Sequence, residues 1–172
     1  MKVALIGTVA ISAITFRTDM ILALKEKNYK VFVFCVDYTE DTRKQIENLG
    51  AVPVDYSLNR AGLNPIKDII DTIKLSKKLK KLKIDLSFSY FVKPVIFGTI
   101  ASKLAGVKKI FAMLEGLGYV FTDLPNGRTK KQNILRMVQV FLYRLSFPLL
   151  DKIIFLNPDD PKDLIEKYNI KT

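Results

Sequence analysis

Short apolar runs alternate along this chain with longer stretches in which apolar residues recur every three or four positions. The short runs are rich in Val, Ile, Leu and Phe, and most are apolar at successive positions. They cover Lys2–Gly7, Lys30–Val36, Val52–Tyr56, Asp85–Phe88, Lys108–Leu114 and Lys152–Asn157. Runs of this length and composition predict central strands of a parallel sheet that helices cover on both faces.

The longer stretches predict helices, with turn and capping residues at their ends. Pro65 and Pro94 suit first-turn positions, and Gly50 and Gly106 directly follow expected helix ends. The helices should cover about Phe16–Asn28, Thr39–Leu49, Pro65–Leu82, Pro94–Ala105 and Thr129–Phe147, and a last one should begin near Pro161. We therefore predict one α/β domain over residues 1–172: a Rossmann-like, doubly wound, mainly parallel sheet of about six strands with helices on both faces.

Composition narrows the chemistry. The 28 Lys and Arg against 17 Asp and Glu leave a net charge of +11, which favours an anionic partner: nucleic acid, a phosphate-bearing substrate or an anionic lipid surface. The chain has no histidine, which excludes Ser-His-Asp and Cys-His catalysis and nearly every zinc site, so we expect no metal. The single cysteine, Cys35, cannot form an internal disulfide, and nothing resembles a signal peptide; both fit a reducing cytoplasm.

The loop after the first strand, Gly7–Ser12, does not match a nucleotide-cofactor fingerprint. It holds one glycine where G-x-G-x-x-G needs three, and no Walker sequence follows, so we expect no nicotinamide or flavin cofactor. Arg17 stands at the start of the expected first helix and could hold a phosphate or sugar oxygen. A surface loop that only connects the first strand to the first helix, and binds no ligand, explains the same residues equally well.

A carboxylate and two glycines follow the fifth apolar run: Glu115, Gly116 and Gly118. Ligands in open α/β sheets lie at the carboxyl ends of strands, and glycine lets the backbone approach a ligand closely. This segment is therefore the strongest local indication of a binding site. Glu115 could instead cap nearby backbone N–H groups, and the glycines could serve loop shape alone.

Two segments bear on membranes. Lys74, Lys77, Lys78 and Lys81 share one face of the third helix beside the stripe Leu75, Leu79 and Leu82, which suits an anionic leaflet; a solvated helix face is the alternative. The stretch Ile134–Phe147 is too short and too interrupted by arginine to span a bilayer. Its stripe Ile134, Val138, Phe141, Leu142 and Leu145 predicts either a helix lying in the interface or one buried against the sheet.

Five pieces, in order along the chain, resemble the N-terminal domain of bacterial family-4 glycosyltransferases of GT-B architecture. The likeness is greatest to those that add a sugar to a lipid-pyrophosphate-linked saccharide. The pieces are Thr15–Arg17, Ser57–Pro65, Val92–Pro94 with Ala101–Val107, Glu115–Thr122 and Lys152–Asp160. Each lies at an expected strand–loop–helix junction, and together they cover nearly the whole chain.

The resemblance implies a retaining hexosyl- or acetylhexosaminyltransferase of polysaccharide or glycan assembly, peripheral on the cytoplasmic face of the plasma membrane. In this family a C-terminal domain holds most of the sugar-nucleotide donor, and the paired-glutamate donor sequence does not occur in these 172 residues. We therefore expect the acceptor-side half alone, either a piece of a longer enzyme or a split subunit, inactive without its C-terminal domain. No cofactor besides the sugar nucleotide is implied.

The resemblance also assigns roles to residues. It implies that Glu115 faces the reacting sugars, although related enzymes have histidine or another polar group there and closer ones have threonine. Arg60 and Lys93, in loops after strands, would bind the acceptor pyrophosphate, with Arg17 beside them. Gly116, Gly118 and Tyr119 would complete the acceptor site, the tyrosine by stacking on a sugar ring. We expect Arg60, Lys93 and Glu115 to converge on one hollow.

Two other functions fit the sequence. A basic nucleic-acid-binding module would explain the net charge, but no helix-turn-helix, zinc-finger or RNA-recognition signature occurs, so no nucleic acid is expected. A non-catalytic, membrane-docked scaffold would keep the fold without the donor half. The sequence identifies neither the donor sugar nor the linkage.

Overall fold

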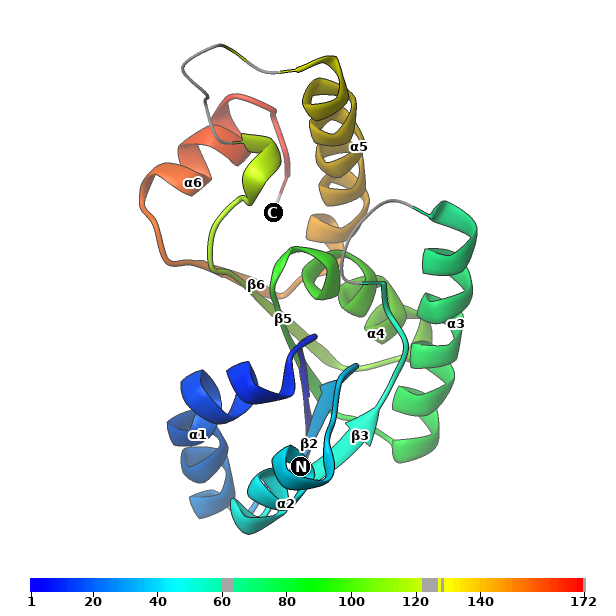
Figure 1. The fold of residues 1–172 in the computed structure, drawn as a ribbon, viewed down its shortest axis with the longest axis vertical. Coiled ribbons are helices and arrows are strands. Elements are labelled where there is room, and N and C mark those ends of the chain that lie inside the picture. The colour runs from blue at the N-terminus through cyan, green and yellow to red at the C-terminus, as the bar shows by residue number, and fades with distance from the viewer. Residues whose placement is uncertain (60–63, 122–126, 128, 172) are drawn as a thin grey trace.

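The computed structural model describes residues 1–59, 64–121, 127 and 129–171, and it has one sheet of six parallel strands (Figure 1). The strands are β1 Lys2–Ile6, β2 Lys30–Cys35, β3 Val52–Asp55, β4 Leu86–Tyr90, β5 Lys109–Leu114 and β6 Lys152–Phe155. Their order, β3-β2-β1-β4-β5-β6, is that of a Rossmann fold, with the switch point between β1 and β4. The predicted fold class is confirmed, and each predicted strand is present within two residues.

Helices cover both faces of the sheet. On one face lie α1 Ala10–Glu26 and α2 Glu40–Asn48; on the other lie α3 Pro65–Leu82, α4 Thr99–Ala105 and α5 Lys130–Ser146. Shorter turns are η1 Pro94–Gly98, η2 Tyr119–Phe121, η3 Phe147–Leu149, α6 Asp159–Pro161 and η4 Lys162–Glu166. The prediction of a continuous helix over Pro94–Ala105 is thus met by two joined segments, η1 and α4.

The predicted start of the first helix is wrong. We expected a long loop over Gly7–Ser12, but α1 begins at Ala10. Its N-cap residue, Val9, offers no side-chain cap, so the sequence carries no start signal there. The cap comes instead from across the fold, because the Ala10 N–H donates to Asp37 Oδ1 at 2.7 Å. Helix α5 has a local signal, a capping box between Thr129 and Gln132.

Each face of the sheet has its own hydrophobic core. Side chains alternate along a strand, so Val3 and Leu5 pack against α1 and α2, whereas Ala4 and Ile6 pack beneath α3, α4 and α5. Cys35 is buried in the first of these cores, and burial raises the pKa of its thiol to about 12. The thiol therefore stays protonated and packs as a small apolar group.

The carboxyl ends of β1 and β4 are packed with no spare room. Tyr90 is fully buried at the end of β4, and its ring lies against the Gly7 backbone. A Cβ at Gly7 would lie 2.3 Å from the Tyr90 Cζ atom. The carbonyl of Gly7 also accepts a hydrogen bond from the Tyr56 hydroxyl at 2.6 Å. Gly7 is therefore required by packing, whether or not a ligand approaches it.

We expect Gly7→Ala to lower the free energy of unfolding by about 1–3 kcal/mol, the usual cost of overpacking a core. Chemical unfolding of the wild type and the variant measures it. In the Tyr90→Leu background the ring atoms are gone, so the same substitution should cost much less. An equal loss in both backgrounds would contradict this packing argument.

Candidate functional site

A pocket of about 660 Å³ opens at the carboxyl edge of the sheet. Most of its described lining comes from the chain from Phe91 through η1, the chain from Glu115 through η2, and one side of α5; Thr8, after β1, also contributes. Its lining includes Lys93, Glu115, Gly116, Gly118 and Tyr119. Of the predicted catalytic and acceptor-binding residues, five thus line one pocket. Arg17 is not in the lining but contacts Glu115, and Arg60 is outside the described residues.

Arg17 forms an ion pair with Glu115, and this pair is the main feature that sequence reasoning missed. Arginine Nη2 contacts Glu115 Oε1, and Nη1 donates to the Phe16 carbonyl at 2.9 Å. The guanidinium carbon lies 4.6 Å from the centre of the Tyr90 ring, a cation–π distance. Burial lowers the pKa of Arg17 from its ordinary value, yet arginine stays charged in proteins. The ion pair thus places a buried guanidinium against the Glu115 carboxylate.

The loop after β5 has an unusual backbone. Gly116 has φ +148° and Gly118 has φ +82°, and an added Cβ at Gly118 would meet only Val92, at 3.8 Å. Glycine is needed here for its conformation rather than for space. On the facing wall Phe91 also lies in the left-handed region, with φ +70°, which is rare for an aromatic residue. Such strain clusters at ligand sites.

Lys93 is already paired. Its ammonium lies 3.0 Å from each carboxylate oxygen of Asp68, on the first turns of α3. Asp68 is 2% exposed, so an unpaired carboxylate there would be costly, and the lysine offsets its charge. The pair ties α3 to the pocket. Two of the three lysine N–H groups serve Asp68, which leaves one for a ligand.

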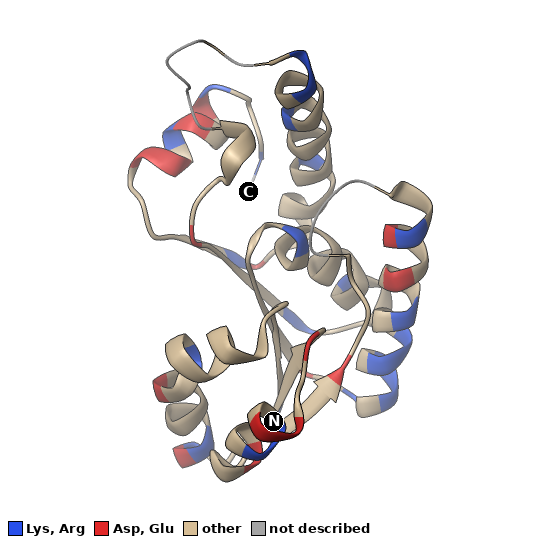
Figure 2. Ribbon diagram, viewed as in Figure 1, with Lys and Arg blue, Asp and Glu red and all other residues tan. Residues whose placement is uncertain are grey.

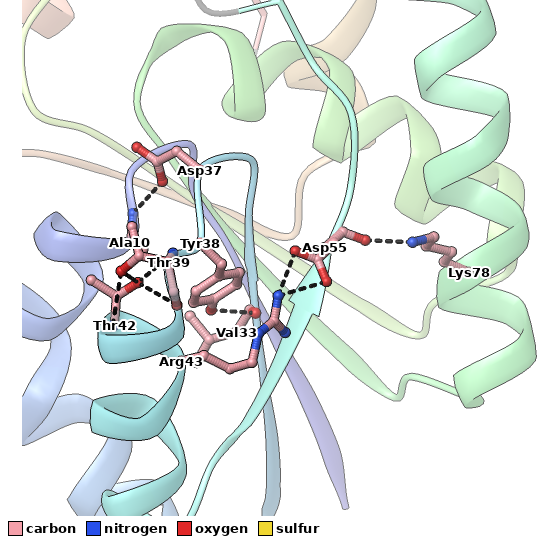
Figure 3. A network of polar contacts seen from close by, with 9 residues as sticks. All are labelled: Ala10, Val33, Asp37, Tyr38, Thr39, Thr42, Arg43, Asp55 and Lys78. Carbon is pink, nitrogen blue, oxygen red and sulfur yellow. Dashed lines mark hydrogen bonds and ion pairs between the residues drawn. The ribbon is translucent and has the colours of Figure 1, made fainter.

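The lysines of α3 are exposed, as predicted, but two of the three leucines that we expected beside them are buried. Lys74, Lys77, Lys78 and Lys81 lie on the outer side of the helix, where basic residues are concentrated (Figure 2). Leu75 and Leu79 are buried in the core. Lys78 donates to the carbonyl of Asp55, whose carboxylate holds Arg43 at 2.8 Å (Figure 3). One of the four lysines is therefore engaged within the protein.

The first half of α3 has reversed polarity. Its isoleucines are between 45% and 73% exposed, and they are Ile66, Ile69, Ile70 and Ile73. Its carboxylates face inward: Asp68 pairs with Lys93, and Asp71 accepts from Ser57 at 2.5 Å. A helix of a water-facing domain normally has the opposite arrangement. An exposed apolar surface of this kind indicates contact with another apolar body.

Helix α5 packs against the sheet along one side and has exposed apolar side chains along another. Val140 and Tyr143 are buried against the sheet, and Leu135, Gln139 and Leu142 line the pocket. The predicted core stripe was wrong in part, because Ile134, Phe141 and Leu145 are exposed, as is Met137. Their exposed fractions run from 49% to 71%. Among the described helices none is long and apolar enough to cross a membrane, and no cluster of three metal-ligating side chains occurs in the same residues.

Comparison with known proteins gives the family. The profile of the family described as Glycosyl transferase 4-like matches residues 2–157. The chain belongs to this family. It is also 35% identical over 157 residues to the N,N'-diacetylbacillosaminyl-diphospho-undecaprenol alpha-1,3-N-acetylgalactosaminyltransferase of Campylobacter jejuni. That match covers 91% of this chain and 40% of the relative, so the chain spans less than half of the relative's length.

Solved structures show the same fold. Acinetobacter baumannii MurG matches 92% of this chain and 41% of its own, with a TM-score of 0.59 at 12% identity. The match to the lipopolysaccharide outer core galactosyltransferase WaaB covers 99% of this chain and 43% of that protein, with a TM-score of 0.58 and 17% sequence identity. The match to the S. aureus MnaA–UDP structure covers 96% of this chain and 42% of that protein, with a TM-score of 0.62 and 16% sequence identity. Likeness at this level shows the fold alone.

We expect a double-mutant cycle between Arg17→Met and Glu115→Gln to give a coupling energy of about 1–3 kcal/mol, because the pair is partly buried. Chemical unfolding of the four proteins measures it. The exposed pair Glu40–Lys44, with atoms 2.8 Å apart on α2, is the matched control and should give about 0.3–0.5 kcal/mol. A coupling no larger than the control would mean that Arg17 and Glu115 do not hold each other.

Proposed function

We propose that this chain is the acceptor-side half of a retaining glycosyltransferase. It would move a hexosyl or acetylhexosaminyl group from a sugar nucleotide to a lipid-diphosphate-linked saccharide. The observation that carries the proposal is a pocket at the carboxyl edge of β5 that presents Glu115, held by Arg17, in a chain of this family. The name of the Campylobacter relative supports the choice of acceptor.

Glu115 would act on the acceptor hydroxyl. Glu115 lines the pocket, and the ion pair with the buried Arg17 holds its side chain in place. A positioned carboxylate can accept the proton of an attacking hydroxyl, or can orient that hydroxyl by accepting its hydrogen bond. Gly116 and Gly118 would let the acceptor approach the backbone, and Tyr119, exposed at the rim, would stack on a sugar ring.

Lys93 would bind the diphosphate with the N–H group that Asp68 leaves over. Arg60, outside the described residues, is proposed for the same ligand, because arginine offers parallel hydrogen bonds to phosphate oxygens. Arg17 would contribute through Glu115 and through its charge. The sugar nucleotide would be held mainly by a C-terminal domain, a proposal in keeping with the 40% of the relative that this chain covers.

The protein would work at the inner face of the plasma membrane, with α3 against the lipid. The exposed isoleucines of α3 lie in the half of the helix that Lys93 ties to the pocket, and lysines follow on the same outer side. Apolar side chains next to lysines suit the headgroup region of an anionic leaflet. Exposed isoleucines make no contact with phosphate charges, so they do not support a nucleic-acid-binding surface.

We expect Glu115→Gln to lower kcat at least about 100-fold, the scale of general acid–base catalysis, with a much smaller change in acceptor KM. The assay uses an enzyme that contains this chain and a donor-binding domain, with lipid-linked saccharide acceptors. Glu26→Gln, at the far end of α1, is the control and should turn over like the wild type. Unchanged turnover in Glu115→Gln would remove the residue from the chemistry.

We expect Lys77→Gln/Lys81→Gln to weaken binding to anionic vesicles by about 2 kcal/mol, since each near-surface lysine contributes about 1 kcal/mol. Flotation with phosphatidylglycerol-containing and pure phosphatidylcholine vesicles measures it. Ile69→Ser/Ile73→Ser should weaken binding to both kinds of vesicle, because apolar burial needs no anionic lipid. Lys25→Gln/Lys27→Gln, at the end of α1 on the other face of the sheet, is the charge-matched control. Equal losses in the control would refute docking through α3.

A further inference from the structure

The pocket is lined mainly by hydrocarbon. Ile96, Phe97, Leu117, Val120, Leu135 and Leu142 form much of its wall. Among the described residues of the lining, Glu115 and Lys93 carry the charged side chains. A saccharide carries a hydroxyl on most of its carbons, and each one buried without a partner costs free energy. Most of this wall therefore suits an apolar ligand better than a sugar.

The polar groups of the wall are largely engaged already. The amide nitrogen of Gln139 donates to the Leu117 carbonyl at 3.1 Å and to the Tyr143 hydroxyl at 2.9 Å. Lys93 gives two of its three hydrogen bonds to Asp68. The pocket thus has a polar part, where Glu115 and Lys93 lie, and an apolar part that η1, η2 and α5 enclose.

The apolar wall continues onto the outer surface of α5. Successive residues of a helix are turned by about 100°, so Leu142, Val138 and Phe141 follow one another around α5 at intervals of about 40° and 60°. Leu142 lines the pocket, Val138 is half-buried, and Phe141 is 58% exposed. Phe141 belongs to the exposed stripe of Ile134, Met137 and Leu145. Hydrocarbon that leaves the pocket therefore has an unbroken apolar path along this helix.

We infer that the apolar part of the pocket and the adjoining surface of α5 bind the first units of the isoprenoid chain of the acceptor. The inference rests on the proposed function, because it takes the diphosphate to lie against Lys93. Hydrocarbon attached to that diphosphate would then enter the apolar part, and the saccharide would extend toward Glu115. The protein would select its acceptor by its lipid as well as by its sugar.

Calorimetry on this chain with three probes tests the inference: inorganic pyrophosphate, farnesyl diphosphate and farnesol. The two farnesyl compounds are used below the concentrations at which they aggregate. We expect farnesyl diphosphate to bind at least about tenfold more tightly than pyrophosphate, because each buried methylene contributes about fourfold. Farnesol should bind more weakly than farnesyl diphosphate, because it lacks the diphosphate that would pair with the Lys93 ammonium. Equal binding of pyrophosphate and farnesyl diphosphate would overturn the inference, as would equal binding of farnesol and farnesyl diphosphate.

Variants locate the site. Leu142→Asn should bring the affinity for farnesyl diphosphate close to that for pyrophosphate while pyrophosphate binding stays the same; thermal unfolding shows whether the variant is folded. Phe141→Ser changes an exposed residue outside the core and should lower the affinity for farnesyl diphosphate by a smaller factor. Leu104→Asn, exposed on α4 and outside the pocket lining, is the control and should bind like the wild type. If the α5 variants bind farnesyl diphosphate like the wild type, the isoprenoid site is not here.

Binding experiments with a Lys93 variant distinguish failure of the isoprenoid site from failure of the proposed function. Lys93→Met should abolish pyrophosphate binding if the diphosphate site is where we propose. Pyrophosphate binding that depends on Lys93, without any gain from the farnesyl group, would overturn the isoprenoid site alone. Pyrophosphate binding that does not depend on Lys93 would count against both.

Discussion

The parallel pairing of β1, β4 and β5 is the constraint on which the rest of the structure depends. In a parallel sheet all strands end at the same edge, so Gly7, Tyr90 and Glu115, far apart in sequence, lie at the ends of neighbouring strands. Tyr90 fills the space beside Gly7, Arg17 lies over the tyrosine ring, and Glu115 pairs with Arg17. These contacts link the ends of the three strands, and the ring and the carboxylate both offset the burial of the guanidinium.

The fold could be predicted from the sequence because its signals are local. Apolar runs, Pro65 and the glycines after helices depend on neighbouring residues, and the predicted strands agree with β1–β6. The start of α1 could not be predicted, since its cap is Asp37, from the loop after β2. The ion pairs of Arg17 and Lys93 depend on strand order in the same way. One signal was available for Lys93: Asp68 and Asp71 fall on the side of α3 that also carries Leu75 and Leu79.

The error over α3 has a different cause. A periodic pattern gives the two sides of a helix but not the medium that each side faces, and we assigned the leucines to the surface beside the lysines. Leu75 and Leu79 in fact pack in the core, and the isoleucines of the first turns face outward. The rule that apolar residues point inward assumes water outside. With four isoleucines exposed and two aspartates buried, the first half of α3 departs from that rule.

Buried charge and exposed hydrocarbon therefore occur on the same helix, and the two are linked. Asp68 and Asp71 occupy inward positions that leucine would fill in an ordinary helix. Their partners follow strand ends: Lys93 lies at the start of the helical segment after β4, and Ser57 lies in the loop after β3. Replacing a buried ion pair with apolar residues is often neutral or stabilising, so stability alone does not explain the pair. A helix that is tied to the carboxyl edge of the sheet by the Asp68–Lys93 ion pair cannot rotate about its axis without breaking that pair.

The outward isoleucines also determine how the molecule behaves away from a bilayer. Exposed apolar area costs about 25 cal/mol per Å² in water, so any partner that covers it lowers the free energy. In a detergent-free buffer the partner most readily at hand is another copy of the chain. Self-association through α3 that mild detergent reverses would thus be the expected behaviour of correctly folded protein during purification, not a sign of misfolding.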